Sequence, residues 1–200
     1  MHRFLIKSAI AALCVIVTPV LIADGQKAVL VTGASSGIGL KITETLASNG
    51  FYVYAGARKD EDLERLDAME NVSSVRLDVT IPEQIDAAAA FVRDQGRGLW
   101  GVVNNAGVAF YSPLSNGPES DVRLTMDVNV YGPYHVNRAF LPLLVESGGR
   151  TTTISSISAF IPGNSGSYSM SKMAVEQYTD TLANELAASG VHVSAVQPGA

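Results

Sequence analysis

The chain has 200 residues, of which 47% are hydrophobic and 16% charged, and its formal net charge is −5 at pH 7. This length and composition predict one globular domain with a core of useful size. Lys and Arg form no run or stripe, which argues against nucleic acid as a partner. Cys14 is the only cysteine, so we expect neither an internal disulfide nor a Cys/His metal site.

The N-terminal residues differ from the rest of the chain. Arg3 and Lys7 precede an uncharged apolar stretch over residues 8–23. This pattern is typical of a cleaved signal peptide, and also of a short membrane anchor over residues 4–23. An apolar extension that packs on the domain is the third possibility. Residues 1–25 are thus predicted to be a signal-like or anchor segment. An anchor implies membrane association, a cleaved signal implies export, and the folded domain is otherwise expected in the cytoplasm.

After residue 26, short β-branched runs alternate with amphipathic segments of helical period. Strands are predicted over residues 27–32, 51–56, 74–79, 99–105, 150–156 and 191–196. Helices are predicted over residues 37–50, 61–69, 82–95, 119–146 and 168–189. Such alternation builds a parallel sheet through crossover connections, with helices on both faces. Residues 26–200 are therefore expected to form an α/β, doubly wound Rossmann fold of the dinucleotide-binding order.

A glycine-rich stretch, TGASSGIG over residues 32–39, follows the first predicted strand and opens the first helix. Its three glycines permit a tight turn, the close approach of a pyrophosphate, and close packing of helix on strand. Free N–H groups and the helix dipole favour an anion at this helix N-terminus. A turn without a ligand is the alternative. The residues assigned to the predicted cofactor site are Gly33, Ser35, Ser36, Gly37, Ile38 and Gly39.

The end of the second strand indicates which nicotinamide cofactor is preferred. A carboxylate there would bind the ribose hydroxyls and repel a 2′-phosphate, but this chain has Ala57 followed by Arg58 and Lys59. Arg58 can hold a 2′-phosphate as a fork, so NADP(H) is favoured and NAD(H) stays possible. Alternatively, the two cations are solvated surface charges paired with Asp60 and Asp62.

In YSMSK, Tyr168 stands four places before Lys172. Residues at this spacing are neighbours on one helix face. An ammonium beside a phenol favours the phenolate, so Tyr168 would exchange protons near neutral pH. The spacing by itself is equally compatible with an exposed pair on a surface helix.

Several short motifs occur together in one order: TGASSGIG, Asp78 in LDVT, NNAG at 104–107, Asn129 in NVYG, Ser156 in ISSIS, YSMSK, and PG at 198–199. As a set they resemble the short-chain dehydrogenase/reductase family over residues 26–200. The stretches around them look most like the branch with retinol, hydroxysteroid and 3-hydroxybutyrate dehydrogenases.

This resemblance implies roles for four residues. Tyr168 would be the general acid in carbonyl reduction and the general base in alcohol oxidation. Lys172 would assist it and bind the nicotinamide ribose, and Ser156 would hydrogen-bond the substrate oxygen. Asn129 would hold a water that links Lys172 to solvent. The resemblance assigns further cofactor contacts to Asp78, Asn105, Ala106, Gly107, Pro198 and Gly199, of which Asn105 could be mainly structural.

The implied activity is oxidation at a CH–OH group, or its reversal, on an apolar secondary or lipid-like alcohol. Sugars, polyols and acyl-chain intermediates stay open as substrates. A protein that binds the nucleotide without catalysis is the alternative. A possible homo-oligomer is also implied.

The sequence departs from the family pattern at two points. The spacing from Ser156 to Tyr168 is one residue shorter than usual, which keeps Ser155 as the second choice. The chain also stops at Ala200, where relatives continue into a substrate-covering loop and a seventh strand. The domain is therefore expected to be a fragment or a C-terminally shortened relative.

Overall fold

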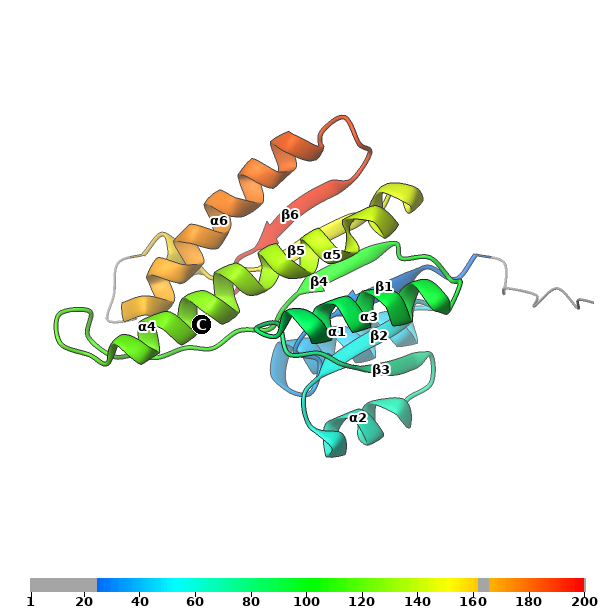
Figure 1. The fold of residues 1–200 in the computed structure, drawn as a ribbon, viewed down its shortest axis with the longest axis horizontal. Helices are drawn as coiled ribbons and strands as arrows, with labels where there is room; N and C mark the ends of the chain where they lie inside the picture. Colours follow the sequence, from blue (N-terminus) through cyan, green and yellow to red (C-terminus); the bar gives the residue numbers. More distant parts are fainter. Residues whose placement is uncertain (1–24, 162–165, 200) are drawn as a thin grey trace, which may run out of the picture.

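Six parallel strands form one sheet in the order β3-β2-β1-β4-β5-β6. The computed structural model describes residues 25–161 and 166–199 (Figure 1). The strands are β1 (Ala28–Val31), β2 (Tyr52–Ala57), β3 (Val72–Arg76), β4 (Gly101–Asn104), β5 (Arg150–Ile154) and β6 (His192–Val196). The α-helices are α1 (Gly37–Ser48), α2 (Asp60–Asp67), α3 (Pro82–Asp94), α4 (Glu119–Met126), α5 (Gly132–Ser147) and α6 (Gly166–Leu186). The doubly wound fold predicted from the sequence is confirmed, and most elements begin and end within a few residues of the expected positions.

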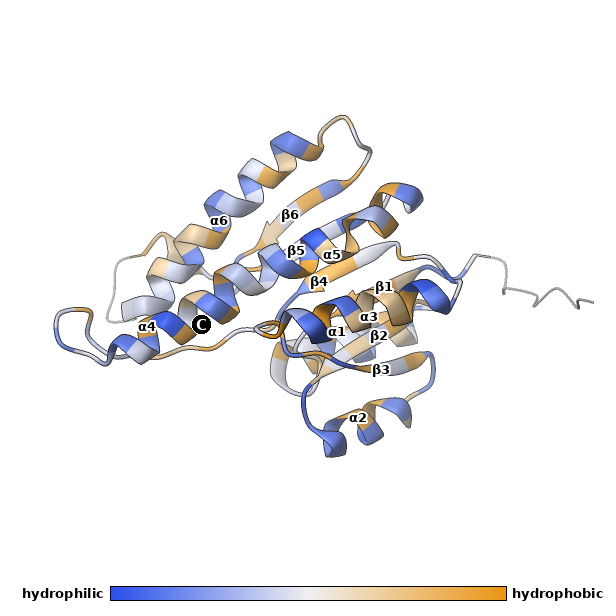
Figure 2. Ribbon diagram, in the orientation of Figure 1, coloured by the Kyte–Doolittle hydropathy of each residue, from blue (hydrophilic) through white to orange (hydrophobic). Residues whose placement is uncertain are grey.

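The two faces of the sheet carry separate hydrophobic cores. In β1, Ala28 and Leu30 pack into a core that contains residues of α3 and α5. Val29 and Val31 point to the other face and pack with residues of α1 and α2. This alternation is the period-two pattern of a strand buried on both faces. Figure 2 shows β4 as largely hydrophobic and α2 as largely hydrophilic.

The long helix predicted over residues 119–146 is present without a break from Glu119 to Ser147, but it is not regular. The chain forms α4, then a wider π-helical turn η1 (Asp127–Tyr131), and then α5. Pro133 has no N–H to donate to the carbonyl of Asn129, four residues earlier, so one regular α-helical hydrogen bond is missing here. Single π-helical turns within α-helices are frequent at functional sites.

The third strand was predicted over residues 74–79, but it lies at Val72–Arg76. Asp78 turns the chain instead of extending the strand. Its carboxylate accepts hydrogen bonds from the Thr80 N–H (2.9 Å) and hydroxyl (2.7 Å), and its carbonyl accepts one from the Ile81 N–H (3.1 Å). This local turn ends the sheet pairing and carries Asp78 to the edge where the strands end.

Within residues 25–161 and 166–199, no helix is long and apolar enough to cross a membrane. The predicted signal or anchor segment falls almost entirely on residues 1–24, which lie outside the described residues.

Candidate active site

Most of the predicted site residues follow the carboxyl ends of the strands, where open α/β sheets bind their ligands. Two hollows adjoin there. A hollow of about 290 Å³ lies between the glycine-rich loop and the ends of β2 and β3. A second, of about 420 Å³, extends to the ends of β5 and β6 and to the start of α6. The two hollows share Ile38, Asn105, Gly107 and Val108 along their walls, so they form one continuous cleft.

The glycine-rich loop leaves the N-terminus of α1 open to the cleft. Gly37, the first residue of α1, has a φ of +54° and no atom within 4 Å of the place a side chain would take. The Ser36 side chain makes no capping hydrogen bond, so the first N–H groups of α1 have no side-chain acceptor. By contrast, a Cβ at Gly39 would collide with the Gly33 carbonyl oxygen and the Asn105 side-chain amide.

Asn105 holds the loop in place from the end of β4. Its Nδ2 donates to the carbonyl oxygens of Thr32 (3.0 Å) and Gly33 (3.1 Å). In return, the Thr32 hydroxyl oxygen accepts from the N–H groups of Asn105 and Ala106, both at 3.0 Å. The amide of Asn105 is thus occupied by the loop. Thr32 is the first residue of the glycine-rich motif, but the motif alone did not predict a role for it in the site.

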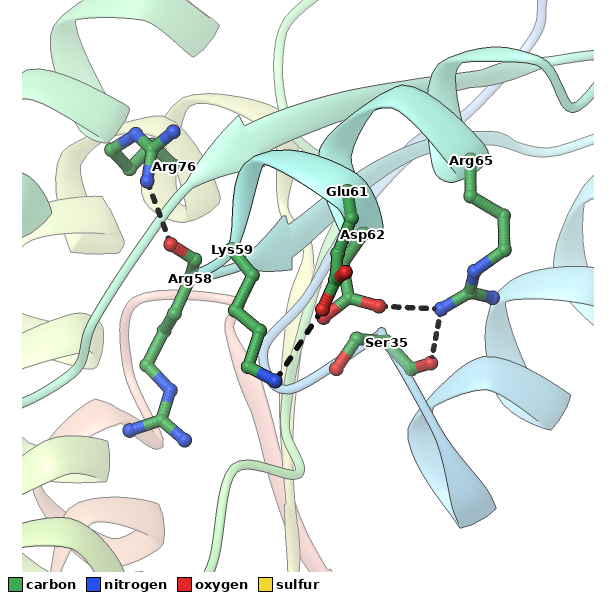
Figure 3. Close-up of polar contacts among 7 residues, drawn as sticks. All are labelled: Ser35, Arg58, Lys59, Glu61, Asp62, Arg65 and Arg76. Atoms are coloured by element: carbon green, nitrogen blue, oxygen red, sulfur yellow. Dashed lines mark hydrogen bonds and ion pairs between the residues drawn. The ribbon is translucent and has the colours of Figure 1, made fainter.

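Arg58 extends from the end of β2 with its side chain 69% exposed, and its Nη1 lies 3.6 Å from Asp78 Oδ2. Figure 3 shows its guanidinium directed away from the other labelled residues. Lys59 pairs with Glu61 (3.4 Å). The alternative pairing with Asp60 and Asp62 is wrong, because those two carboxylates bind Arg76 and Arg65 instead. The Arg58 guanidinium therefore remains accessible beside the glycine-rich loop.

Arg65 also contacts this loop, although no pattern in the sequence predicts a role for it. From α2, its Nη2 donates to the carbonyl oxygen of Ser35 (2.6 Å) and to Asp62 Oδ1 (2.7 Å), as Figure 3 shows. In the sequence, Arg65 and Asp62 look like a solvated pair on a polar helix face. Only the close approach of α2 to the loop reveals the contact with Ser35.

The Asp78 carboxyl lies at the side of the cleft opposite the loop. Burial raises its pKa, but the hydrogen bonds from Thr80 and the nearby Arg58 guanidinium outweigh burial, and the pKa is held below its usual value. Asp78 is therefore ionised near neutral pH and can accept hydrogen bonds from a ligand.

Tyr168 and Lys172 lie in the first turns of α6, with the Lys172 Nζ 5.5 Å from the centroid of the Tyr168 ring. The ammonium donates to the carbonyl oxygen of Ile154, at the end of β5 (2.7 Å). Only 5% of Lys172 is exposed. Burial lowers the pKa of Lys172 to about 8, against the opposing charge of Glu176. The two side chains border the same hollow.

Asn129 lies in the π-helical turn and connects three parts of the site. Its Oδ1 accepts from the Val108 N–H (2.9 Å), and its Nδ2 donates to the Val108 carbonyl oxygen (2.9 Å) and to Ser171 Oγ (3.0 Å). A Cβ at Gly107 would lie 3.4 Å from Asn129 Oδ1 and 3.8 Å from Lys172 Nζ. Asn129, Gly107 and Lys172 are therefore close neighbours.

Both serines of the ISS motif border the hollow with Tyr168. Ser155 Oγ donates to the Lys172 carbonyl oxygen at 3.5 Å, whereas Ser156 Oγ accepts from the Ser158 N–H (3.1 Å) at the start of the short turn η2 (Ile157–Ala159). The Ser156 hydroxyl hydrogen is not used by that bond. Residues 162–165, where the shorter spacing falls, lie outside the described residues. Pro198 and Gly199 border this hollow from the end of β6.

This arrangement agrees with what the chain shares with known proteins. Residues 27–200 match the profile of the family described as short chain dehydrogenase. The chain therefore belongs to this family of oxidoreductases, and the family resemblance of its motifs is confirmed.

The chain is 39% identical over 178 residues to the oxidoreductase YbbO of Escherichia coli K12, across 87% of this chain and 65% of YbbO. It is 40% identical over 183 residues to estradiol 17-beta-dehydrogenase 2 of Rattus norvegicus, across 87% of this chain and 48% of that protein. A solved short chain dehydrogenase from Burkholderia cenocepacia J2315, in complex with NADP, has a TM-score of 0.80 and 35% identity, across 87% of this chain and 72% of that one. The chain thus spans about two thirds of YbbO and about half of the estradiol dehydrogenase.

Proposed function

We propose that the protein is an NADP(H)-dependent oxidoreductase that interconverts an apolar secondary or lipid-like alcohol and its carbonyl. The observation that carries this proposal is the convergence of Ser156, Tyr168 and Lys172 on one hollow that continues into the glycine-rich cleft. A protein that only bound a nucleotide would have no need of a hydroxyl, a phenol and a buried ammonium at that point.

The residues of the cleft fit a nicotinamide dinucleotide. The open N-terminus of α1 suits a pyrophosphate, and Asp78 suits the adenine edge. The exposed guanidinium of Arg58 suits a 2′-phosphate, since a planar fork binds phosphate in bidentate fashion. The complex of the Burkholderia relative with NADP is consistent with this preference.

In the proposed mechanism, the bound cofactor supplies or takes up the hydride, and the protein handles the proton. Tyr168 gives a proton to the carbonyl oxygen during reduction and takes it from the hydroxyl during oxidation. Ser156 donates a hydrogen bond to the same substrate oxygen and stabilises its developing charge. Lys172 stabilises the Tyr168 phenolate and binds the nicotinamide ribose.

The proton on Tyr168 is replaced from solvent through Lys172 and a water held at Asn129. The Asn129 side chain is already engaged with Val108 and Ser171. We assign the water to the Asn129 backbone carbonyl, because Pro133 cannot donate to it.

The mouth of the cleft supports an apolar substrate. Tyr111 and Ile157 border the hollow that holds Tyr168, and they are 72% and 39% exposed. Exposed large apolar side chains at the opening of a hollow are typical of a binding surface for an apolar ligand.

The first test is a titration of the protein with NADPH and, separately, with NADH, followed by cofactor fluorescence. We expect saturable binding with NADPH clearly tighter. Equal binding, or tighter binding of NADH, would contradict the role of Arg58. A folded protein that binds neither cofactor would contradict the dinucleotide site itself.

The second test is the variant Tyr168→Phe, assayed with NADPH and a panel of apolar ketones. Loss of the proton donor is expected to reduce kcat by about 10²- to 10⁴-fold, while cofactor affinity stays the same. Tyr131→Phe, at an exposed tyrosine that does not border either hollow, is the matched control and should retain activity. Equal turnover by Tyr168→Phe and the wild type would mean that another group carries the proton.

A further inference from the structure

Lys172 and Glu176 are the only charged side chains that are buried among residues 25–161 and 166–199, with 5% and 7% of their surface exposed. They lie four residues apart on α6 and so share one face of the helix. A buried charge is unfavourable unless an opposite charge or hydrogen bonds compensate for it. The proposed mechanism gives Lys172 a role, but it leaves the burial of Glu176 unexplained.

The hydrogen-bond partner of Glu176 is Gln197, which directly follows the last strand of the sheet. Gln197 Nε2 donates to both carboxylate oxygens of Glu176, at 2.9 Å and 3.0 Å. Gln197 directly follows β6 and precedes Pro198 and Gly199, which border the hollow beside Tyr168. The Pro198 carbonyl oxygen also accepts from the Ile157 N–H at 3.2 Å. The Glu176 carboxylate thus joins α6 to the segment that forms one wall of the cleft.

The Glu176 charge also acts on Lys172. Burial lowers the pKa of Lys172 to about 8, and Glu176 opposes that fall. Tyr168 is the titratable neighbour on the same helix, with its ring centroid 5.5 Å from Nζ. The charged or titratable groups on the other elements packed against α6 are exposed or half-buried: Glu119, Asp121 and Arg123 on α4, Asp127 and Tyr131 on η1, Tyr134, His135, Arg138 and Glu146 on α5, and His192 on β6. Glu176 is therefore the buried charge available to balance the ammonium.

We propose that Glu176 is a positioning residue, which ties segment 197–199 to α6 through Gln197 and supplies the negative charge that balances the buried Lys172. The functional consequence, a correctly shaped nicotinamide end of the cleft, rests on the proposed function. Its two parts, the tie and the charge, depend on different atoms and can be separated by substitution.

Glu176→Gln removes the charge but keeps an oxygen that can accept from Gln197. Gln197→Met keeps the charge and the length of side chain 197 but removes the donor. Glu185→Gln makes the same charge change at an exposed position further along α6 and serves as the matched control. Circular dichroism establishes that each variant is folded.

The charge is tested in the full chain labelled with ¹³C-lysine, by following the Cε resonance of Lys172 against pH. The wild-type pKa is expected near 8. Glu176→Gln should lower it by about one unit, because an opposing charge is lost from a buried ammonium. Glu185→Gln and Gln197→Met should leave it unchanged. An unchanged pKa in Glu176→Gln overturns the proposal, since a merely structural glutamate would give that result.

The tie is tested by NADPH titration and by hydrogen exchange of the Ile157 N–H, which donates to the Pro198 carbonyl oxygen (3.2 Å). Gln197→Met should accelerate exchange of this N–H and weaken NADPH binding about tenfold, the effect of a lost hydrogen bond to a charged group. Wild-type exchange in Gln197→Met overturns the proposal. If the wild type binds no NADPH, the proposed function fails, but exchange and the lysine titration still decide this inference.

If Glu176→Gln does not fold, Glu176→Asp replaces it. Aspartate keeps the charge but falls short of Gln197. The expected result is then a wild-type pKa for Lys172 together with faster exchange of the Ile157 N–H, and any other combination overturns the proposal.

Discussion

Arg58 and Arg65 both lie beside the glycine-rich loop, but their guanidinium groups differ in the partners that they bind. The Arg65 guanidinium is bound to the Ser35 carbonyl and to Asp62, so it supports the backbone of the loop. The Arg58 guanidinium is exposed, with Asp78 at 3.6 Å as its nearest charged partner. Arg58 can thus exchange partners for a phosphate, whereas Arg65 would first have to release the loop.

This difference predicts that a variant of Arg58 affects the binding of NADPH alone, whereas a variant of Arg65 affects NADPH and NADH equally. Arg58→Gln should weaken NADPH binding about 10- to 100-fold and leave NADH binding within about twofold, because only NADPH has the 2′-phosphate. Arg65→Gln should weaken both cofactors by the same factor, about three- to tenfold, because it loosens the loop that both share. Fluorescence titrations with the two cofactors measure both effects. A loss confined to NADPH in Arg65→Gln would mean that Arg65 contacts the phosphate directly.

At the residue scale, the sequence predicted roles for side chains that belong to local motifs. Tyr168 and Lys172 were predicted from their helical spacing together with the family resemblance, and Arg58 from its place after a strand. Arg65 and Gln197 were missed because their contacts join distant segments: Arg65 reaches Ser35 across 30 residues, and Gln197 reaches Glu176 across 21. Neither residue type nor spacing signals such a contact.

Among the elements, α1 depends most closely on a single side-chain position. Gly39 is buried on the first turn of this helix, between the Gly33 carbonyl oxygen and the Asn105 amide. Asn105 in turn holds the loop to β4. The packing of α1 against the loop therefore requires that residue 39 has no side chain.

Gly39→Ala is expected to lower the free energy of unfolding by about 2 to 4 kcal/mol, because the added methyl group forces α1 away from backbone atoms that cannot rotate aside. Urea denaturation measures the change. Thr45→Ala, on the exposed side of the same helix, should change the free energy by less than about 0.5 kcal/mol. If Gly39→Ala were as stable as Thr45→Ala, the close approach of α1 to the loop would be wrong.

The π-helical turn shows what an element-scale prediction cannot capture. The sequence predicted a continuous helix over residues 119–146, and the apolar spacing on both sides of the turn agrees with helix. Pro133 was a local sign of an interruption. The form of the interruption depends on Val108, which lies 21 residues before Asn129 and holds both ends of its amide.

For the whole molecule, the order of the six strands followed from the alternation of strands and helices, because crossover connections allow few arrangements. Because all six strands are parallel, the segments that follow them meet at one edge of the sheet. The alternation of strands and helices did not predict how the two hydrophobic cores differ in the side chains that they contain. One core contains Tyr54, which is fully buried and packs edge-on against Tyr52 and Phe91.

The Tyr54 hydroxyl has no hydrogen-bond partner among the described residues. Burial raises the pKa of Tyr54 to about 12, from an ordinary value of 10.0. The folded protein therefore keeps this phenol neutral in a pH range where the unfolded chain ionises it. Because the folded pKa is the higher one, the contribution of Tyr54 to stability is complete below about pH 10 and is lost as the pH rises toward about 12.

Tyr54→Phe should therefore stabilise the protein by about 1 kcal/mol at neutral pH, since it removes a buried polar group that forms no hydrogen bond. It should also reduce the loss of stability above about pH 10, because phenylalanine cannot ionise. Urea denaturation at neutral and at alkaline pH measures both effects. Tyr111→Phe, at a tyrosine that is 72% exposed, should change neither. A Tyr54→Phe variant less stable than the wild type at neutral pH would show that the hydroxyl has a partner in solution, such as a buried water between the sheet and α3.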